Sequence, residues 1–504
     1  MVLPGEVRPG DLPTVIQHYI GGRHTASASG ATFDVADPVS NKPYAKAAAG
    51  ATEDVRRAVA AAQAAFDDGP WPQMPPRQRA RVLTAVAEGI ERRGDQLARW
   101  ETFDTGLPIT QARGQAHRAA ENFRFFADVI VTAHEDAYRV GTEQLNYVVR
   151  KPVGVAGLIT PWNTPFMLES WKLAPALASG CCVVLKPAEL TPLSASVWPE
   201  ILFEAGLPEG VFNMVHGFGE QAGQALVEHP GVPLISFTGE TVTGQTIMAN
   251  AAPHLKGLSM ELGGKSPVIV FADADLDQAL DSAVFGVYSL NGERCTAGSR
   301  VLVERSVYGE FVARFAERAE RVRVGPPADP ATELGALVHP EHYDRVRRFI
   351  EIGQAEGARL VAGGDRPAHL PQGNYLAATV FADVSPSMRI FQEEIFGPVA
   401  ALTPFDGEAE AVALANDVRY GLAGYVWTSD LHRGHRIAQA IEAGMIWLNS
   451  HNIRDLRTPF GGVKASGLGK EGGEHSIDFY TDSQIIHVAL SPPHTPRFGA
   501  AGQR

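Results

Sequence analysis

Three cysteines are the residues best suited to nucleophilic chemistry in this chain of 504 residues, and their settings differ. Cys295 lies in a polar, glycine-containing segment, Ser289-Leu290-Asn291-Gly292-Glu293-Arg294-Cys295-Thr296-Ala297-Gly298-Ser299-Arg300, whereas Cys181 and Cys182 lie in the largely apolar run 176–185. A thiol reacts as its thiolate, which neighbouring positive charge, here that of Arg294, favours and apolar burial disfavours. We therefore interpret Cys295 as a candidate nucleophile and the adjacent pair as core residues. Taken alone, Cys295 could instead be packed as a small hydrophobe.

Three further motifs accompany Cys295 along the chain. Two precede it, Thr160-Pro161-Trp162-Asn163-Thr164-Pro165 and Met260-Glu261-Leu262-Gly263-Gly264-Lys265-Ser266-Pro267, and one follows it, Phe391-Gln392-Glu393-Glu394-Ile395-Phe396-Gly397-Pro398. Together with the asparagine-glycine setting of Cys295, these motifs resemble the aldehyde dehydrogenase superfamily, in this order and over nearly the whole chain. Any one of them alone would be a weak signal. The four together favour a chemical role for Cys295.

Length, charge and cysteine content limit the kind of protein this is. A chain of 504 residues exceeds what one hydrophobic core usually serves, so at least two domains are expected. The net charge of -13 argues against nucleic acid as a partner, because phosphate binding needs clustered lysine and arginine. Three cysteines, two of them adjacent, cannot form a disulfide framework, and no signal peptide or run of about 18 apolar residues occurs. We expect a cytoplasmic protein with no membrane partner, and no metal, since no His/Cys cluster has ligand spacing.

Apolar runs alternate with helical patterns in two series. The first has strands at 153–160, 183–185, 211–215 and 234–238, separated by helices at 166–179, 193–205 and 220–228. The second has strands at 267–271 and 300–304, with helices at 276–289 and 307–319. Such alternation implies right-handed crossovers and parallel sheets with helices on both faces. Alternating residues over 135–151 predict an extended hairpin.

With the resemblance, these patterns predict an α/β fold of the aldehyde dehydrogenase type, with a Rossmann-like cofactor domain, a catalytic domain and a β-hairpin arm. We assign residues 1–134 and 154–262 to the NAD-binding domain, with 471–482 returning to it. Residues 263–470 are assigned to the catalytic domain, and 135–153 and 483–504 to the oligomerisation arm and tail. In the family this hairpin resembles an arm that crosses to a neighbouring subunit, so a homo-oligomer, either dimer or tetramer, is expected.

The resemblance implies NAD as the cofactor. The segment His216 to Gly223 follows a strand and opens a helix, but its glycine spacing is one residue longer than the usual dinucleotide fingerprint, and loop glycines without a ligand are the alternative. Lys186 and Glu189 would bond the adenine ribose, and a carboxylate there would disfavour NADP, unless the two are a solvated pair. Glu240 stands where the family has serine, and a carboxylate near phosphates is unfavourable. The other expected cofactor contacts are Thr160, Pro161, Trp162, Gly219, Gly223, Phe237, Gly239, Leu262, Glu394 and Phe396, the last two being otherwise an acidic surface turn.

The resemblance also implies a mechanism for an aldehyde substrate. Cys295 would add to the carbonyl to give a thiohemiacetal, while the Asn163 side-chain amide and the Cys295 backbone N–H would stabilise the developing oxyanion. Glu261 would be the general base for the thiol and for the water that hydrolyses the thioester, which requires a pKa raised toward neutrality. Lys172 would support Asn163 or merely brace its helix. Papain-like hydrolysis would need a histidine base, and none of the 16 histidines stands in a recognisable partner motif.

The segment 452–467 resembles, more closely than the family in general, the dehydrogenases of hydroxymuconic-type semialdehydes in aromatic catabolism, above all those acting on 5-carboxymethyl-2-hydroxymuconate semialdehyde. These substrates carry carboxylates, which match the planar fork of arginine, so Arg118 and Arg457 are expected to bind the substrate beside Trp171 and Phe460. Arg457 could instead be a paired structural arginine. The alternatives are an aliphatic or betaine-type aldehyde as substrate, or a non-catalytic protein on the same fold.

Overall fold

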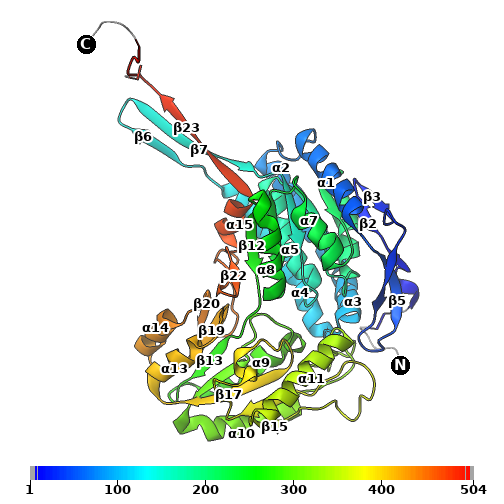
Figure 1. The fold of residues 1–504 in the computed structure, drawn as a ribbon, viewed down its shortest axis with the longest axis vertical. Coiled ribbons are helices and arrows are strands. Elements are labelled where there is room, and N and C mark those ends of the chain that lie inside the picture. The colour runs from blue at the N-terminus through cyan, green and yellow to red at the C-terminus, as the bar shows by residue number, and fades with distance from the viewer. Residues whose placement is uncertain (1–5, 8, 494, 500–504) are drawn as a thin grey trace.

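The computed structural model describes residues 6, 7, 9–493 and 495–499. Two lobes, each built on a sheet, lie one above the other, and a β-arm projects from the upper lobe (Figure 1). The upper sheet lies in the half assigned from the sequence to NAD binding, and the lower sheet lies in the half that carries Cys295. The outermost residues assigned to the NAD-binding domain and to the tail, 1–5, 8, 494 and 500–504, lie outside the described residues.

The upper sheet has eight strands in the order β22-β12-β11-β8-β9-β10-β2-β3. Its five central strands are parallel, whereas β22, β2 and β3 are antiparallel to their neighbours. The sequence predicted four of the parallel strands but omitted β12, because its five residues contain no β-branched or aromatic side chain. The bounds are β22 (Gly467–Leu468), β12 (Gly257–Glu261), β11 (Leu234–Thr238), β8 (Val155–Ile159), β9 (Cys182–Lys186), β10 (Phe212–Met214), β2 (His18–Ile20) and β3 (Arg23–Thr25).

One strand of this sheet comes from a segment assigned to the other domain. β22 pairs antiparallel with β12 through Met260↔Leu468 and Glu261↔Gly467, although residues 263–470 were expected to be catalytic. The helix that follows, α15 (Gly473–Phe479), contacts α5 of the upper lobe, as the returning segment 471–482 was expected to do. The chain therefore re-enters the cofactor half a few residues earlier than the sequence indicated.

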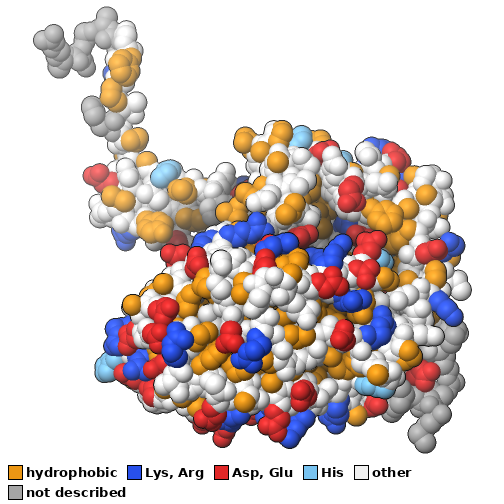
Figure 2. Space-filling model, turned by 60° about the horizontal axis from the view of Figure 1, so that its bottom comes forward, with side chains coloured by type: hydrophobic (Ala, Val, Ile, Leu, Met, Phe, Trp, Pro, Cys, Tyr) orange, Lys and Arg blue, Asp and Glu red, His pale blue; other side chains and the backbone are white. Residues whose placement is uncertain are grey.

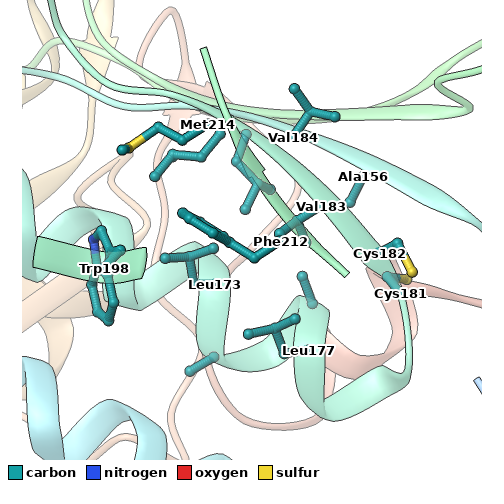
Figure 3. Packing of buried hydrophobic residues seen from close by; sticks show 14 of the residues in the cluster. Ala156, Leu173, Leu177, Cys181, Cys182, Val183, Val184, Trp198, Phe212 and Met214 are labelled. Carbon is teal, nitrogen blue, oxygen red and sulfur yellow. The ribbon is translucent and has the colours of Figure 1, made fainter. Parts of the chain in front are cut away.

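Helices cover both faces of the upper sheet and close its core. Cys181 and Cys182 are fully buried there beside Leu177 and Val183, and burial raises the pKa of each thiol to about 12 (Figure 3). The prediction that this pair is core filling is confirmed. The helices are α1 (Thr52–Asp67), α2 (Pro76–Arg92), α3 (Gly94–Thr105), α4 (Ile109–Thr132), α5 (Pro165–Ser179), α6 (Trp198–Glu204), α7 (Gln224–Glu228) and α8 (Thr241–Ala251).

The lower sheet has seven strands, parallel except for the edge strand β15. Their order is β15 (Arg359–Ala362), β16 (Thr379–Ala382), β17 (Val399–Phe405), β14 (Arg300–Glu304), β13 (Pro267–Val270), β19 (Ala423–Trp427) and β20 (Met445–Leu448). Its helices are α9 (Leu276–Tyr288), α10 (Arg305–Arg321), α11 (Pro340–Ala355), α12 (Arg389–Gln392), α13 (Gly407–Asn416) and α14 (Leu431–Ala440). Two small sheets complete the fold, one of β1 (Val15–Ile16), β5 (Pro43–Ala48) and β4 (Thr32–Ala36), the other of β18 (Tyr420–Gly421) and β21 (Val463–Lys464).

The arm is a three-stranded antiparallel sheet in the order β23-β7-β6. The predicted hairpin forms β6 (Ala137–Val140) and β7 (Gln144–Pro152), and β23 (Thr481–Ala489) from the far end of the chain pairs along the whole of β7. Hydrophobic side chains lie open along it (Figure 2). Among them, Tyr138 and Ile485 are more than half exposed. Among the helices of the described residues, none combines the length and the apolar character needed to cross a membrane.

Candidate active site

The carboxyl ends of three adjacent parallel strands create the site. In the upper sheet β9 and β10 lie on one side of β8, and β11 and β12 lie on the other, so the strand order reverses between β8 and β11. Ligands of open parallel sheets bind at such a switch point. The register sets Ile159 beside Phe237 and Thr238 beside Glu261, so Thr160, Gly239 and Leu262 follow side by side.

A cavity of about 260 Å³ lies at these strand ends and reaches across to the lower lobe. It has a largely apolar lining interrupted by charged groups, which is the usual composition of a small-molecule site. Predicted site residues that line it are Asn163, Glu261, Cys295, Pro161, Trp162, Gly239, Glu240, Leu262, Glu394, Phe396, Arg118, Trp171 and Phe460. Thus the structure brings the expected nucleophile, base and oxyanion donor to one cavity.

The loop that carries Cys295 is held by unusual backbone positions. Asn291 has φ 58° and Gly292 has φ 72°, in the left-handed region that asparagine and glycine tolerate best. The Asn291 side chain donates to Gly106 O at 3.1 Å, which ties the loop to the cofactor lobe. A Cβ on Gly292 would lie 2.3 Å from the carbonyl carbon of Gly397, so only glycine fits there. The asparagine-glycine pair before Cys295 therefore serves the geometry of its loop.

Cys295 is half-buried and faces the cavity. Burial raises the pKa of its thiol to about 12, and the charges of Glu261 and Glu394 add to the rise, whereas Arg294 lowers it. The expectation that Arg294 makes this thiol anionic is thus wrong for the protein without ligands, because loss of solvation outweighs one neighbouring cation. A base must remove the proton when the substrate arrives.

Glu261 has the properties such a base needs. Its side chain is only 4% exposed, and neither carboxylate oxygen has a hydrogen-bond partner within the described residues. Burial, followed by repulsion from Glu471, raises its pKa well above the ordinary value, and Lys172 opposes that rise. A Cβ on Gly461 would lie 2.3 Å from Glu261 Oε1, so the glycine leaves room for the carboxylate. The direction of the shift is the one that general base catalysis near neutral pH requires.

Asn163 and Lys172 do not touch the same partner. The Asn163 side-chain amide donates to Glu293 O at 2.8 Å, next to Arg294 on the Cys295 loop. Lys172 Nζ instead donates to Glu471 Oε1 at 2.6 Å and to Ser236 Oγ at 2.8 Å. Lys172 thus forms a buried ion pair with Glu471, and its predicted support of Asn163 stays a prediction.

Glu471 was missed in the sequence, although it lines the cavity and is only 6% exposed. A signal for it existed. Lys172 stands in an apolar helix that is buried nearly throughout, and a buried ammonium needs an anionic or hydrogen-bonding partner. The sequence showed that a partner was required, but nothing in it identified a residue 299 positions away.

The adenine side of the expected cofactor site is built by β9 and the turn after β10. Lys186 Nζ donates to Glu189 Oε2 at 2.8 Å, so these two residues are a pair with the carboxylate part-exposed. Gly219 and Gly223 bound a single π-helical turn, which accounts for the extra residue in their spacing. A Cβ on Gly223 would come within 3.8 Å of the Lys186 side chain, so the turn packs directly over Lys186.

Polar groups without partners mark the strand ends where the dinucleotide would pass. Thr160 Oγ1 and Thr238 Oγ1 are buried, and neither has a hydrogen-bond partner within the described ranges. Phe237 packs under Gly239, where a Cβ would lie 2.4 Å from its ring. Glu240 is exposed at the start of α8, so its carboxylate can point to solvent. The free hydroxyls and the glycine leave room for a ligand at these ends.

The far end of the cavity holds the predicted nicotinamide contacts. Glu394 Oε1 accepts from Gly264 N at 2.8 Å, and burial raises the pKa of this carboxyl to about 7. Phe396 lies in the left-handed region at φ 60°, and its ring meets that of Trp162 edge-on at 5.3 Å between centroids. A bulky residue at such a φ is strained and persists only when its surroundings enforce it.

Two residues of α11 enforce that conformation, and no motif in the sequence indicated them. His342 Nε2 lies 2.7 Å from Phe396 O, and Arg345 donates to Ile395 O at 2.6 Å and to Glu394 O at 2.8 Å. Both side chains line the cavity. They stand one turn apart on a helix with many other charged residues, so their periodicity did not distinguish them from a solvated face.

On the substrate side the structure corrects one of the two predicted arginines. Arg457 does not line the cavity; its side chain is 80% exposed and pairs with Asp455. Arg454, three residues earlier, lies instead in the cavity, with its guanidinium carbon 3.6 Å from the Trp171 ring centroid and 4.2 Å from that of Phe460. The alternative interpretation of Arg457 as a paired structural arginine is the one the structure supports.

The positive charges of Arg454 and Arg118 are not fully balanced by nearby negative charges. Arg454 Nε and Nη2 are buried without hydrogen-bond partners among the residues described, and burial lowers its pKa to about 9. Burial lowers the pKa of Arg118 to about 10, and repulsion from Arg294 adds to the fall. Unpartnered guanidinium groups around an apolar cavity indicate a ligand that brings negative charge.

One group of metal-ligand type lies outside the cavity. Glu91, His117 and Glu121 bring ligand atoms within 4.8 Å of one another on α2 and α4. Both carboxylates already pair with Arg124, so this group is explained as a surface ion-pair cluster.

Comparison with known proteins gives one consistent result. The model of the "Aldehyde dehydrogenase family" matches residues 24–486. The Escherichia coli 5-carboxymethyl-2-hydroxymuconate semialdehyde dehydrogenase is 49% identical over 92% of this chain and 98% of its own, and the Pseudomonas sp. (strain CF600) 2-hydroxymuconic semialdehyde dehydrogenase is 43% identical over 94% and 99%. Among solved structures, HpcC from Thermus thermophilus has a TM-score of 0.94 at 52% identity, covering 96% of this chain and 95% of that one. An indole-3-acetaldehyde dehydrogenase solved with NAD+ has a TM-score of 0.95 at 40% identity, covering 97% and 100%.

Proposed function

The chain belongs to the aldehyde dehydrogenase family, and from this we propose that it oxidises a carboxylated semialdehyde of the hydroxymuconic type to the corresponding acid, with NAD+ as acceptor. The observation that carries the proposal is the meeting of Cys295, Glu261 and two arginines without an ion-pair partner among the described residues, Arg118 and Arg454, at one cavity. Each side chain has a role in that reaction.

The upper half of the site fits the cofactor. Lys186 and Glu189 would hold the adenine ribose, Gly239 and the start of α8 would face the pyrophosphate, and Glu394 with Phe396 would hold the nicotinamide half. The hydroxyls of Thr160 and Thr238 supply free donors beside them. Bound NAD+ supplies the acceptor for the hydride that leaves the substrate carbon. The pairing of Glu189 with Lys186 leaves a carboxylate where NADP would carry a phosphate, which favours NAD.

The chain's own residues carry the covalent steps. Glu261 accepts the thiol proton, directly or through a water, and the Cys295 sulfur bonds to the aldehyde carbon. The free N–H of the Asn163 amide and the Cys295 backbone N–H stabilise the oxygen that becomes negative. After hydride loss the carbon is a thioester, and Glu261 releases the thiol proton to solvent. The ionised carboxylate then takes a proton from the water that hydrolyses the thioester. The acid is released and the thiol is restored.

The identity of the aldehyde is argued from charge. Arg118 and Arg454 present guanidinium groups to the cavity, and each can bind a carboxylate with two parallel hydrogen bonds. A betaine-type aldehyde carries a quaternary ammonium group, which these cations would repel, so the arginines argue against the runner-up substrate. The names of the relatives at 43% and 49% identity specify muconic semialdehydes, which agrees with this choice.

The proposal is tested by following NADH absorbance with 2-hydroxymuconic semialdehyde and with a neutral aldehyde of similar length. Wild-type protein should have the higher kcat/KM for the carboxylated substrate. Arg454→Met should lower kcat/KM for that substrate only. Equal losses for both aldehydes, or no preference in the wild type, would remove the substrate assignment.

We also propose that the chain forms a homo-oligomer, a dimer or tetramer, through the arm. Exposed hydrophobic side chains on β6, β7 and β23 support this, since isolated three-stranded sheets of this kind bury little surface alone. Light scattering should give a multiple of the 54.0 kDa chain mass, and Ile485→Asp should lower it; a monomeric wild type would contradict the proposal.

A further inference from the structure

The position of Arg294, another arginine that lines the cavity, allows an inference that deepens the proposed function and rests on it. We infer that Arg294 binds a second carboxylate of the substrate, so the preferred aldehyde is one that carries two carboxylates. Arg454 and Arg118 would hold one of these groups on one side of Cys295, and Arg294 would hold the other.

The position of Arg294 points to a ligand. It immediately precedes Cys295, lines the cavity and is half-buried. Its guanidinium donates to one neutral partner, Ser289 Oγ, at 2.9 Å. Within the described part of the chain no carboxylate lies in ion-pair range of it.

Negatively charged groups act unequally on Arg118, Arg294 and Arg454. Arg454 lies near enough to Glu471 and Glu261 for both to raise its pKa. For Arg118, burial is the main cause of the lowered pKa, the charge of Arg294 adds to it, and Cys295 opposes it. Arg118 and Arg294 therefore both line the cavity, and neither forms an ion pair with an Asp or Glu among the described residues. A single carboxylate held at Arg454 and Arg118 would leave Arg294 uncompensated, whereas a second carboxylate would balance it.

A role limited to activating Cys295 does not account for Arg294. Its charge does lower the pKa of the thiol, but burial and two carboxylates outweigh that effect and leave the pKa at about 12. The residues next to Arg294, Tyr425 and His451, also do not provide it with an anionic partner. Tyr425 donates its hydroxyl to Thr296 O, and both His451 ring nitrogens lack partners among the described residues, so neither supplies Arg294 with an acceptor of negative charge.

The experiment compares two semialdehydes that differ by one carboxylate, 2-hydroxymuconic semialdehyde and its 5-carboxymethyl derivative, with a neutral aldehyde as a third substrate. The proteins are the wild type, Arg294→Met and Arg294→Lys, each saturated with NAD+. Lysine keeps the charge but loses the planar fork, so it separates charge from bidentate binding. The rate of Cys295 alkylation by iodoacetamide is measured in all three to detect any effect on the thiol itself.

The expected result is that the wild type prefers the dicarboxylated substrate. Arg294→Met should lower kcat/KM for it by about 10- to 100-fold, mainly through KM, and lower the value for the monocarboxylated one by no more than about threefold. Arg294→Lys should give an intermediate loss, which also serves if the methionine variant is poorly folded. Equal losses for all three aldehydes with slower alkylation, or an unchanged ratio between the semialdehydes, would overturn the inference. Neither outcome touches the proposed function, which fails separately if wild-type protein does not favour either semialdehyde over the neutral aldehyde.

Discussion

The two halves of the cavity are built differently. On the cofactor side the expected contacts stand at the ends of β8, β11 and β12, where strand register fixes them to within a residue. On the substrate side the decisive groups are long side chains, Arg118 from α4 and Arg454 from an irregular loop. In the proposed site, backbone at parallel strand ends would hold the cofactor, whereas long side chains from a helix and a loop would select the substrate.

The largest effect is expected from substitution of Cys295, where the cofactor half and the substrate half of the cavity meet. Cys295→Ala should lower kcat for aldehyde oxidation by at least about a thousandfold, because the covalent step is lost. The matched control is Cys182→Ala, in the core of the cofactor lobe, which should lower thermal stability slightly and leave most of the activity. NADH formation measures both. Comparable activity in the two variants would contradict the assignment of the nucleophile.

A second variant separates chemistry from cofactor binding. Glu261→Gln should lower kcat by about 10²- to 10⁴-fold with a small change in the Kd of NAD+. The pKa of Glu261 is raised by burial, so this base is protonated and inactive at low pH. Wild-type kcat should therefore increase as pH rises through that pKa. The variant should lack this limb, and retention of it would assign the ionisation to another group.

The substrate half is probed by two arginines three positions apart. Arg454→Met should lower kcat/KM for a carboxylated semialdehyde by about 10- to 100-fold, since a charged bidentate contact is lost. Arg457→Met should change it by less than about twofold, because Arg457 is exposed and paired with Asp455. The reverse order of effects would restore Arg457 as the substrate residue.

The smallest effect concerns cofactor choice. Glu189→Gln removes the carboxylate at the adenine end, so the ratio of kcat/KM for NADP to that for NAD should rise by about five- to tenfold. The effect is modest because the Glu189 side chain is one-third exposed and its charge is screened by solvent. Glu220→Gln, exposed on the neighbouring turn, is the control, and an equal change there would show a general effect of charge.

The sequence predicted the fold and the cofactor half more completely than the substrate half. Strands rich in valine and isoleucine were recognisable, whereas β12 lacked β-branched residues and was omitted. Cys295, Glu261 and Asn163 stood in motifs, so they could be named before their meeting at one cavity was known.

The predictions that failed depended on contacts that only the three-dimensional structure displays. In Arg454-Asp455-Leu456-Arg457 both arginines suit a carboxylate, and only the turn that pairs Arg457 with Asp455 decides which one faces the cavity. Similarly, Glu471 and the two α11 residues act across long sequence separations. The effect of Arg294 on the Cys295 thiol was predicted from adjacency alone. Burial, which the sequence does not display, raises the pKa of this thiol by more than Arg294 lowers it.

The most direct test of the account is to trap the covalent adduct. Wild-type protein, mixed with NAD+ and a carboxylated semialdehyde and quenched in acid during the first turnover, should carry an acyl group on part of the chains by intact mass, located by peptide mapping on the fragment that contains Cys295. The adduct should form with a burst of NADH. A burst of NADH without any adduct, or an adduct at another residue, would contradict the claim that this sulfur captures the substrate carbonyl.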